Sequence, residues 1–144
     1  MATDSGAFDL GRQSKVVVKW NGLTVDLGIV EGFSPKQDSV TITLKGIDGK
    51  RRQKFIPNGW SGTIAVSRSG NGLDQVVTAI ETMWENGVGI PDAQIYQYVS
   101  ELDGSRTVFC FNAVQFHLGD AGTWKVDDAV KQSIGWSAQR RVIV

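Results

Sequence analysis

The chain has 144 residues, no net formal charge and one cysteine, Cys110. A chain of this length typically forms one domain, and a single cysteine excludes a disulfide framework. No apolar run approaches the roughly 20 residues of a membrane-spanning helix, and the first 14 residues lack the apolar core of a secretory signal. We therefore expect a cytoplasmic protein without membrane insertion, with a flexible N-terminal arm at residues 1–14 and a single domain at residues 15–144.

The domain begins with a predicted hairpin. Residues 15–20 (KVVVKW) are rich in β-branched side chains, which favour a strand. Asn21 and Gly22 follow, and both tolerate the positive φ that a tight hairpin turn requires. Residues 23–33 read as the return strand, in which Gly28 and Gly32 indicate a bend or a bulge.

Residues 38–45 (DSVTITLK) alternate between apolar and polar side chains, which predicts a strand with two different faces. We expect one face to belong to the core and the other to be polar and uncharged. The apolar set is Val40, Ile42 and Leu44, and the polar set is Ser39, Thr41 and Thr43.

A long basic loop is predicted at residues 45–59, before the next strand at residues 60–68. Five of the fifteen basic residues of the chain lie within ten positions here, and only Asp48 opposes them: Lys45, Lys50, Arg51, Arg52 and Lys54. This window carries a net charge of +4 and the rest of the chain −4. The loop could be solvated, could bind nucleic acid with the flanking Phe55 and Trp60 stacking on bases, or could contact another copy of the chain.

The second half predicts one helix and three strands. Apolar residues recur every three or four positions over residues 73–86, and Gly87 follows as a helix stop. Strands are expected at residues 94–101, at residues 106–118 after a turn at Asp103-Gly104, and over much of the chain from Lys125 onward. About seven strands in hairpins with one helix predict a mainly β fold: an antiparallel two-sheet sandwich or open barrel with one packed α-helix.

The chemistry-bearing residues do not form a catalytic pattern. His117 and Cys110 are seven positions apart on one predicted strand, so they point to opposite faces. Asp127 and Asp128 are neighbours and would also diverge on a strand. We expect no enzyme activity, no catalytic or metal-binding residues, and no cofactor.

The order of these motifs resembles the tail tube proteins of contractile-tailed bacteriophages. The resemblance covers residues 15–144 and rests on KVVVKWNGLTVDLG, SVTITLKG, a basic segment ending in PNGWSGTIAVSR, LDQVVTAIETMW, YQYVSELDGSRTVFCFNAVQF and a closing strand after GTWKVDDAVKQSIGWSAQRR. No single motif is diagnostic, and the tube protein of type VI secretion has the same architecture.

The resemblance implies a structural virion protein whose hexameric rings stack into the inner tube of a contractile tail, the conduit for DNA ejection. It implies partners in the sheath, the baseplate and the tail terminator, and a place in the tail of a virion assembled in the cytoplasm of a bacterial host. The segment 45–59 would contact a neighbouring subunit or ring through Lys45, Asp48, Lys50, Arg51, Arg52, Lys54, Phe55 and Trp60. Short uncharged side chains suit a DNA channel, so Ser39, Thr41 and Thr43 are candidates for lining the lumen.

Three other functions remain open on the sequence. The chain could form the tube of a type VI secretion system or a tailocin. It could be a baseplate protein that caps a tube, since such a protein would share the fold. It could instead be a β-barrel that binds nucleic acid through the basic loop.

Overall fold

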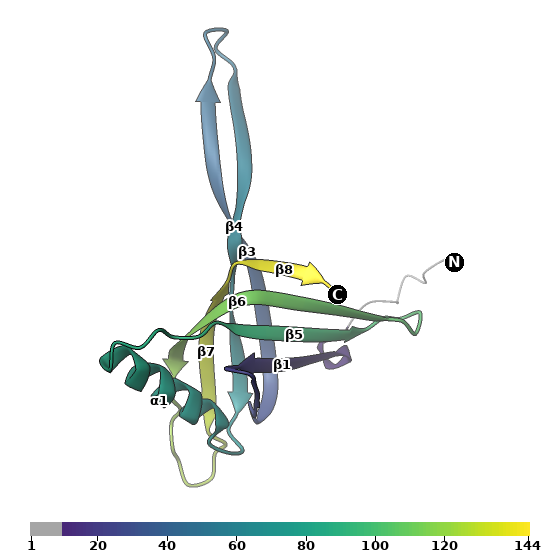
Figure 1. Ribbon diagram of the computed structural model, residues 1–144. Coiled ribbons are helices and arrows are strands. Elements are labelled where there is room, and N and C mark those ends of the chain that lie inside the picture. Colours follow the sequence, from purple (N-terminus) through teal and green to yellow (C-terminus); the bar gives the residue numbers. More distant parts are fainter. Residues whose placement is uncertain (1–9) are drawn as a thin grey trace.

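The computed structural model describes residues 10–144 (Figure 1). These residues form one α-helix, one short 3-10 helix and eight strands. The elements are η1 (Gly11–Gln13), β1 (Ser14–Trp20), β2 (Leu23–Val25), β3 (Ile29–Lys45), β4 (Arg51–Ser67), α1 (Gly72–Glu85), β5 (Ala93–Ser100), β6 (Arg106–Asp120), β7 (Lys131–Ala138) and β8 (Arg140–Ile143). Within residues 10–144, no helix has the length and apolar character needed to cross a membrane.

The eight strands form one antiparallel sheet, in the order β2-β1-β5-β6-β7-β4-β3, with β8 also paired to β6. The sheet curls but does not close, and α1 packs at one side of it (Figure 1). This architecture confirms the predicted antiparallel, mainly β fold with one helix.

Strand β6 joins the two halves of the sheet. Its first part pairs with β5 on one edge and β8 on the other, and its later part pairs with β7. Between the two parts, Ala113 has φ 53°, which is uncommon for a residue with a side chain. The strand bends here, and this bend lets one strand serve both halves of the sheet.

The core lies inside the curl of the sheet and is rich in aromatic rings. Trp136 and Phe111 are fully buried, and their ring centroids lie 4.9 Å apart. Phe33 stacks on Trp136 at 5.6 Å. Helix α1 contributes Leu73 and Val76, its two buried residues. The helix therefore covers one end of the core with its first two turns.

The predicted hairpin at residues 15–33 is only partly correct. Asn21 and Gly22 have the expected positive φ values of 52° and 80°. The return strand, however, ends at Val25, and the chain re-enters the sheet at Ile29 as the long strand β3. Gly28 makes this break possible: its φ is 82°, and a Cβ there would lie 2.9 Å from the carbonyl oxygen of Ser67.

The predicted ends of the chain also need correction. The sequence favoured strand from Lys125 onward, but residues 121–130 form a loop before β7 begins at Lys131. Of the predicted arm at 1–14, residues 1–9 lie outside the described residues. Residues 11–13 form η1, and the Gln13 side-chain amide donates a hydrogen bond to the carbonyl of Ser100 at 3.0 Å.

Candidate assembly surface

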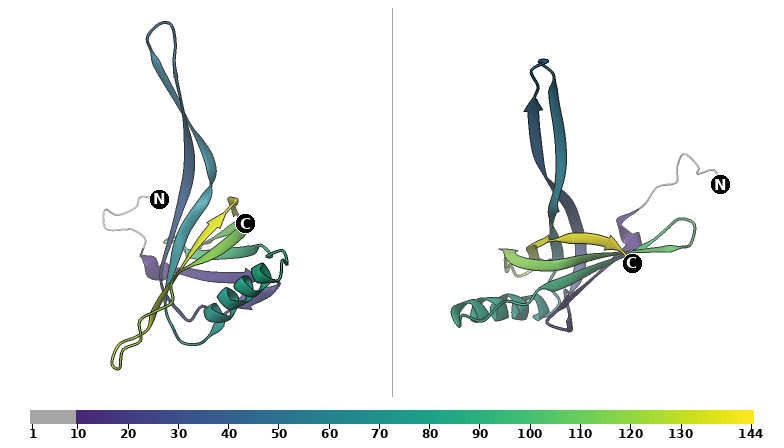
Figure 2. Two further views of the ribbon diagram at one scale, coloured as in Figure 1. Left: turned by 90° about the vertical axis from the view of Figure 1, so that its left-hand side faces the viewer. Right: turned by 45° about the horizontal axis from the view of Figure 1, so that its top comes forward.

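Residues 38–59 form a two-stranded arm that projects from the sheet. Strand β4 pairs with β7 only from Trp60 onward, whereas its first residues pair with β3 alone. Figures 1 and 2 show the two strands extending well beyond the rest of the molecule. The predicted loop at 45–59 is therefore wrong in most of its length: it is a strand from Arg51 onward, and only residues 46–50 form a turn.

A compact turn closes the tip of the arm. The Gly46 amide donates to the carbonyl of Lys50 at 3.1 Å. The Asp48 carboxylate accepts hydrogen bonds from the Arg52 guanidinium at 2.9 Å and the Lys50 amide at 3.0 Å. These two bonds, the first above all, hold the pKa of Asp48 below its usual value. Gly49 has φ 80°, a conformation that favours glycine. The tip is thus a defined structure.

One face of the arm, its apolar face, carries exposed aliphatic side chains, with Arg52 and Lys54 beside them toward the tip. Val40, Ile42 and Leu44 are 47%, 51% and 64% exposed. In register, Val40 lies opposite Ile56, which is also exposed. The alternation did predict an amphipathic strand, but the prediction that its apolar face joins the core was wrong, because these side chains are exposed and no other element of residues 10–144 lies over them. A surface of this kind usually marks an interaction site.

The other face of the arm is polar and becomes basic toward the tip. Ser39, Thr41 and Thr43 lie along it and are exposed. Phe55 lies opposite Thr41 on this face and is 67% exposed. At the end of the face, Lys45 is directly opposite Arg51. The structure thus brings the candidate lumen residues and part of the basic set onto one surface.

The remaining basic residues of the arm lie elsewhere. Lys54 and Arg52 oppose Ile42 and Leu44 on the apolar face, and Lys50 belongs to the tip turn. Trp60 sits at the base of the arm, where its ring packs against Phe111 at 5.8 Å. The Arg141 guanidinium lies 4.2 Å from the centroid of the same ring. Trp60 therefore anchors the arm to the body of the molecule.

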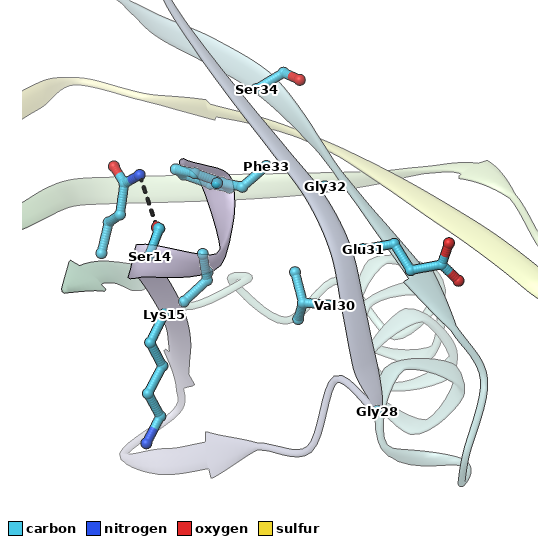
Figure 3. Close-up of a pocket in the computed structure, with 11 residues that line it drawn as sticks. Ser14, Lys15, Gly28, Val30, Glu31, Gly32, Phe33 and Ser34 are labelled. Carbon is cyan, nitrogen blue, oxygen red and sulfur yellow. Dashed lines mark hydrogen bonds between the residues drawn. The ribbon is translucent and has the colours of Figure 1, made fainter. Parts of the chain in front are cut away.

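A second feature is the seam where the sheet fails to close. Strands β1 and β3 face each other across a pocket of about 610 Å³ (Figure 3). Val30 projects between the strands, whereas the charged ends of Lys15 and Glu31 point away from the gap. The side-chain amide of Gln97 donates to the Ser14 hydroxyl at 3.1 Å. Polar groups do not converge here as they would in a catalytic pocket.

The residues considered for catalysis are dispersed. Cys110 is buried and His117 is exposed. The prediction that they point to opposite faces is wrong, because the bulge at Ala113 puts one extra residue on β6 between them and reverses the alternation. Asp127 and Asp128 lie in the loop at 121–130 and not on a strand. Within residues 10–144, no group of three or more His, Cys, Asp or Glu side chains is placed to hold a metal ion.

The loop at residues 121–130 is the surface that sequence reasoning missed. Trp124 is 67% exposed and Val126 is 99% exposed. The short run GTWKVDD alternates polar and apolar residues from Thr123 to Asp127, as a strand does, so its pattern gave no sign of an exposed loop. The sequence predicts strand from Lys125 onward, and it does not single out Trp124 and Val126 as exposed apolar side chains.

This chain is similar in fold to several solved structures but matches no known family by sequence. Neither a protein-family model nor a curated protein sequence matches this chain. Among solved structures, it is similar to a chain of the PVC sheath/tube terminator of an extracellular contractile injection system, with a TM-score of 0.61 and 11% identity over 97% of this chain and 99% of that one.

Two further solved structures agree. A chain of the PVC sheath-tube complex has a TM-score of 0.61 and 10% identity, with 99% of both chains covered. The SPP1 tail tube has a TM-score of 0.55 and 14% identity over 93% of this chain and 77% of that one. The protein therefore has a tail-tube-like fold, shared by tube and terminator proteins of tails and injection systems.

Proposed function

We propose that this protein is a structural subunit of a tail tube: six copies form a ring, and rings stack into the inner tube of a contractile tail. The observation that carries the proposal is the arm, whose apolar face is exposed within a chain that shares its fold with tube proteins over nearly its whole length. A surface of this kind gains stability only by contact with another molecule. The tube then serves as a conduit for DNA during ejection.

The proposed partners follow from the same role. The tube lies within a sheath and ends at a baseplate and a terminator, in a virion assembled in the cytoplasm of a bacterial host. The function is structural, without enzyme activity or a cofactor. The neighbours include chains from a sheath-tube complex and from a baseplate, which supports these partners.

Electron microscopy of the purified protein in negative stain tests the proposal. At high concentration and without nucleic acid, we expect rings and hollow tubes with a central channel. A variant in which residues 38–59 are replaced by Asn-Gly is the matched control and should form no stacked tubes. A wild-type protein that remains monomeric at every concentration would contradict the proposal.

A tube-capping role is the second candidate, because two of the similar structures are a sheath/tube terminator and a tube-terminating cap. A cap forms rings that do not stack on one another. Rings without tubes in the same micrographs would favour this role.

Nucleic-acid binding through the basic arm is the remaining alternative. It predicts affinity for short single strands that falls steeply with salt. Absence of binding at about 50 mM salt would exclude it.

A further inference from the structure

The tip of the arm carries a like-charged pair that lacks an acidic partner within residues 10–144. Lys45 and Arg51 are directly opposed across the two strands, and like charges in this arrangement repel. The ion pairs of the described residues are Arg52–Asp48, Arg68–Asp74 and Lys131–Glu31, so neither Lys45 nor Arg51 takes part in one. Ile47, in the turn beside them, is fully exposed. The tip thus offers two positive charges next to an apolar side chain.

The loop at residues 121–130 carries the complementary set. Asp127 and Asp128 are adjacent and exposed, and neither belongs to the three described ion pairs. Trp124 and Val126 add exposed apolar surface immediately before them. The loop also holds the exposed Lys125, so its two carboxylates give it a net negative charge beside apolar side chains, whereas the tip is positive.

This loop is held in place by Arg68, the residue after β4, and by the start of β7. The Arg68 amide donates to the carbonyl of Val130 at 2.8 Å, and the Arg68 guanidinium lies 5.1 Å from the ring centroid of Trp124. The buried Gln132 side chain donates to the carbonyl of Ala121 at 3.1 Å. Both ends of the loop are thus fixed before any partner arrives, which reduces the entropy lost on binding.

The two surfaces lie at opposite ends of the molecule. The arm rises at one end and the 121–130 loop hangs from the other, in Figure 1 and in the left view of Figure 2. They cannot meet within one chain, but they can meet between two copies in the same orientation. Such a contact joins unlike surfaces and propagates head to tail.

We propose that the arm tip of one copy docks on the 121–130 loop of a second copy, with Lys45 and Arg51 facing Asp127 and Asp128. The inference rests on the proposed function and adds to it the surface that receives the arm. Charge complementarity fixes the register of the contact, and Ile47 with Val126 and Trp124 supplies the apolar area.

Helix α1 offers a competing acidic surface. Glu81 and Glu85 are exposed beside Trp84, which is 77% exposed. The helix, however, lies along the side of the body (Figure 1), so a contact there would join copies laterally. This helix therefore provides a matched control for the loop.

Reciprocal charge reversal tests the proposal on the full chain. The variants are K45E/R51E, D127K/D128K, their combination and the control E81K/E85K, each compared with wild type by sedimentation and negative-stain microscopy at low salt. We expect each reversal at the tip or loop to raise the concentration needed for stacking by about tenfold or more, because like charges then meet across the contact. The combination should restore stacking, and the helix control should stack as wild type does.

The neutral variants K45Q/R51Q and D127N/D128N show whether the reversed variants fail to stack because they misfold or because the contact between copies is lost. They introduce no repulsion, so they should fold as wild type does and stack at an intermediate concentration. Normal stacking of the reversed variants, or failure of the combination to restore it, would overturn this proposal and leave the tube function intact. Restoration of the K45E/R51E variant by E81K/E85K would place the contact on the helix and also overturn it. A wild-type protein that never self-associates would overturn both the contact and the function.

Discussion

At the scale of single residues, Gly62 of β4 and Gly135 of β7 both lie close to other residues, but only the neighbour of Gly135 can move away. A Cβ on Gly62 would lie 2.0 Å from the carbonyl oxygen of Ser34 and 2.9 Å from the Trp136 ring. A Cβ on Gly135 would lie 2.1 Å from the Nε2 atom of His117. The neighbours of Gly62 are backbone and a buried ring, whereas His117 is exposed and its ring can turn into solvent.

The same substitution should therefore have unequal effects. We expect Gly62→Ala to lower the free energy of unfolding by about 1–3 kcal/mol, because the core must shift to admit the methyl group. Gly135→Ala should cost less than about 1 kcal/mol, since glycine itself weakens a strand by about 0.5–1 kcal/mol relative to alanine. Urea unfolding of both variants measures the difference. Equal losses of stability would show that the His117 ring is fixed.

Asp48 gives the arm tip a pH dependence. The Arg52 guanidinium and the Lys50 amide stabilise the carboxylate, and its pKa lies below the usual value of 3.8. A lowered acid pKa contributes stability above the usual pKa, and this contribution is lost as the pH falls through the lowered value. We expect the Lys50 amide to lose protection from hydrogen exchange as the pH drops below about 4.

The variant Asp48→Ala should expose the Lys50 amide at neutral pH as well. The thermal midpoint should stay unchanged, because the turn lies outside the core. Asp103→Ala is the control: Asp103 accepts bonds from Ser105 in another turn, so its loss should leave the tip protected. A lower thermal midpoint for Asp48→Ala would mean that the turn supports the body.

At the scale of elements, the sequence predicted those whose partners lie in the same chain. The Asn21-Gly22 turn, the helix near residues 73–86 and the buried Ile64 and Val66 of β4 follow from local signals. Val40, Ile42 and Leu44 have the same alternation as a core strand. An alternating pattern predicts that one face of a strand is covered, but it does not tell whether the same chain or another molecule covers it. The sequence therefore predicts a core strand followed by a loop where the structure has an exposed arm.

The arm should be dispensable for folding. Gln37 lies opposite Trp60 at its base, so replacing residues 38–59 with Asn-Gly joins two paired positions by a favourable two-residue turn. We expect this variant to keep the free energy of unfolding of the wild type, measured in urea, within about 0.5 kcal/mol, as changes away from the core usually do. It should also lose the stacking of rings into tubes. Unfolding of the variant would show that the arm contributes to the core.

At the scale of the whole molecule, the candidate site spans surfaces that the sequence cannot relate. The basic segment was recognisable from its charge, and its place in the chain after an alternating strand was correct. The basic segment and residues 121–130 lie at opposite ends of the molecule because of the way β6, β7 and β4 are arranged in the sheet. That arrangement joins residues far apart in sequence, and no local pattern encodes which end of the sheet each loop occupies.

Two kinds of contact should respond differently to salt. The proposed tip-to-loop contact pairs exposed charges, which are screened beyond about 10 Å at 0.1 M salt and about 3 Å at 1 M. The edge of β3, and the edge formed by β2 with the part of β1 before Val18, can join copies through backbone hydrogen bonds, which salt weakens far less. Raising the salt from about 0.05 M to about 1 M should therefore shorten tubes into single rings, visible by sedimentation and microscopy. The K45Q/R51Q variant should lose most of this salt dependence, because its tip carries two fewer charges. Tubes whose length is unchanged at about 1 M salt would contradict this prediction. That result would show that stacking depends on the apolar face of the arm and not on its charged tip.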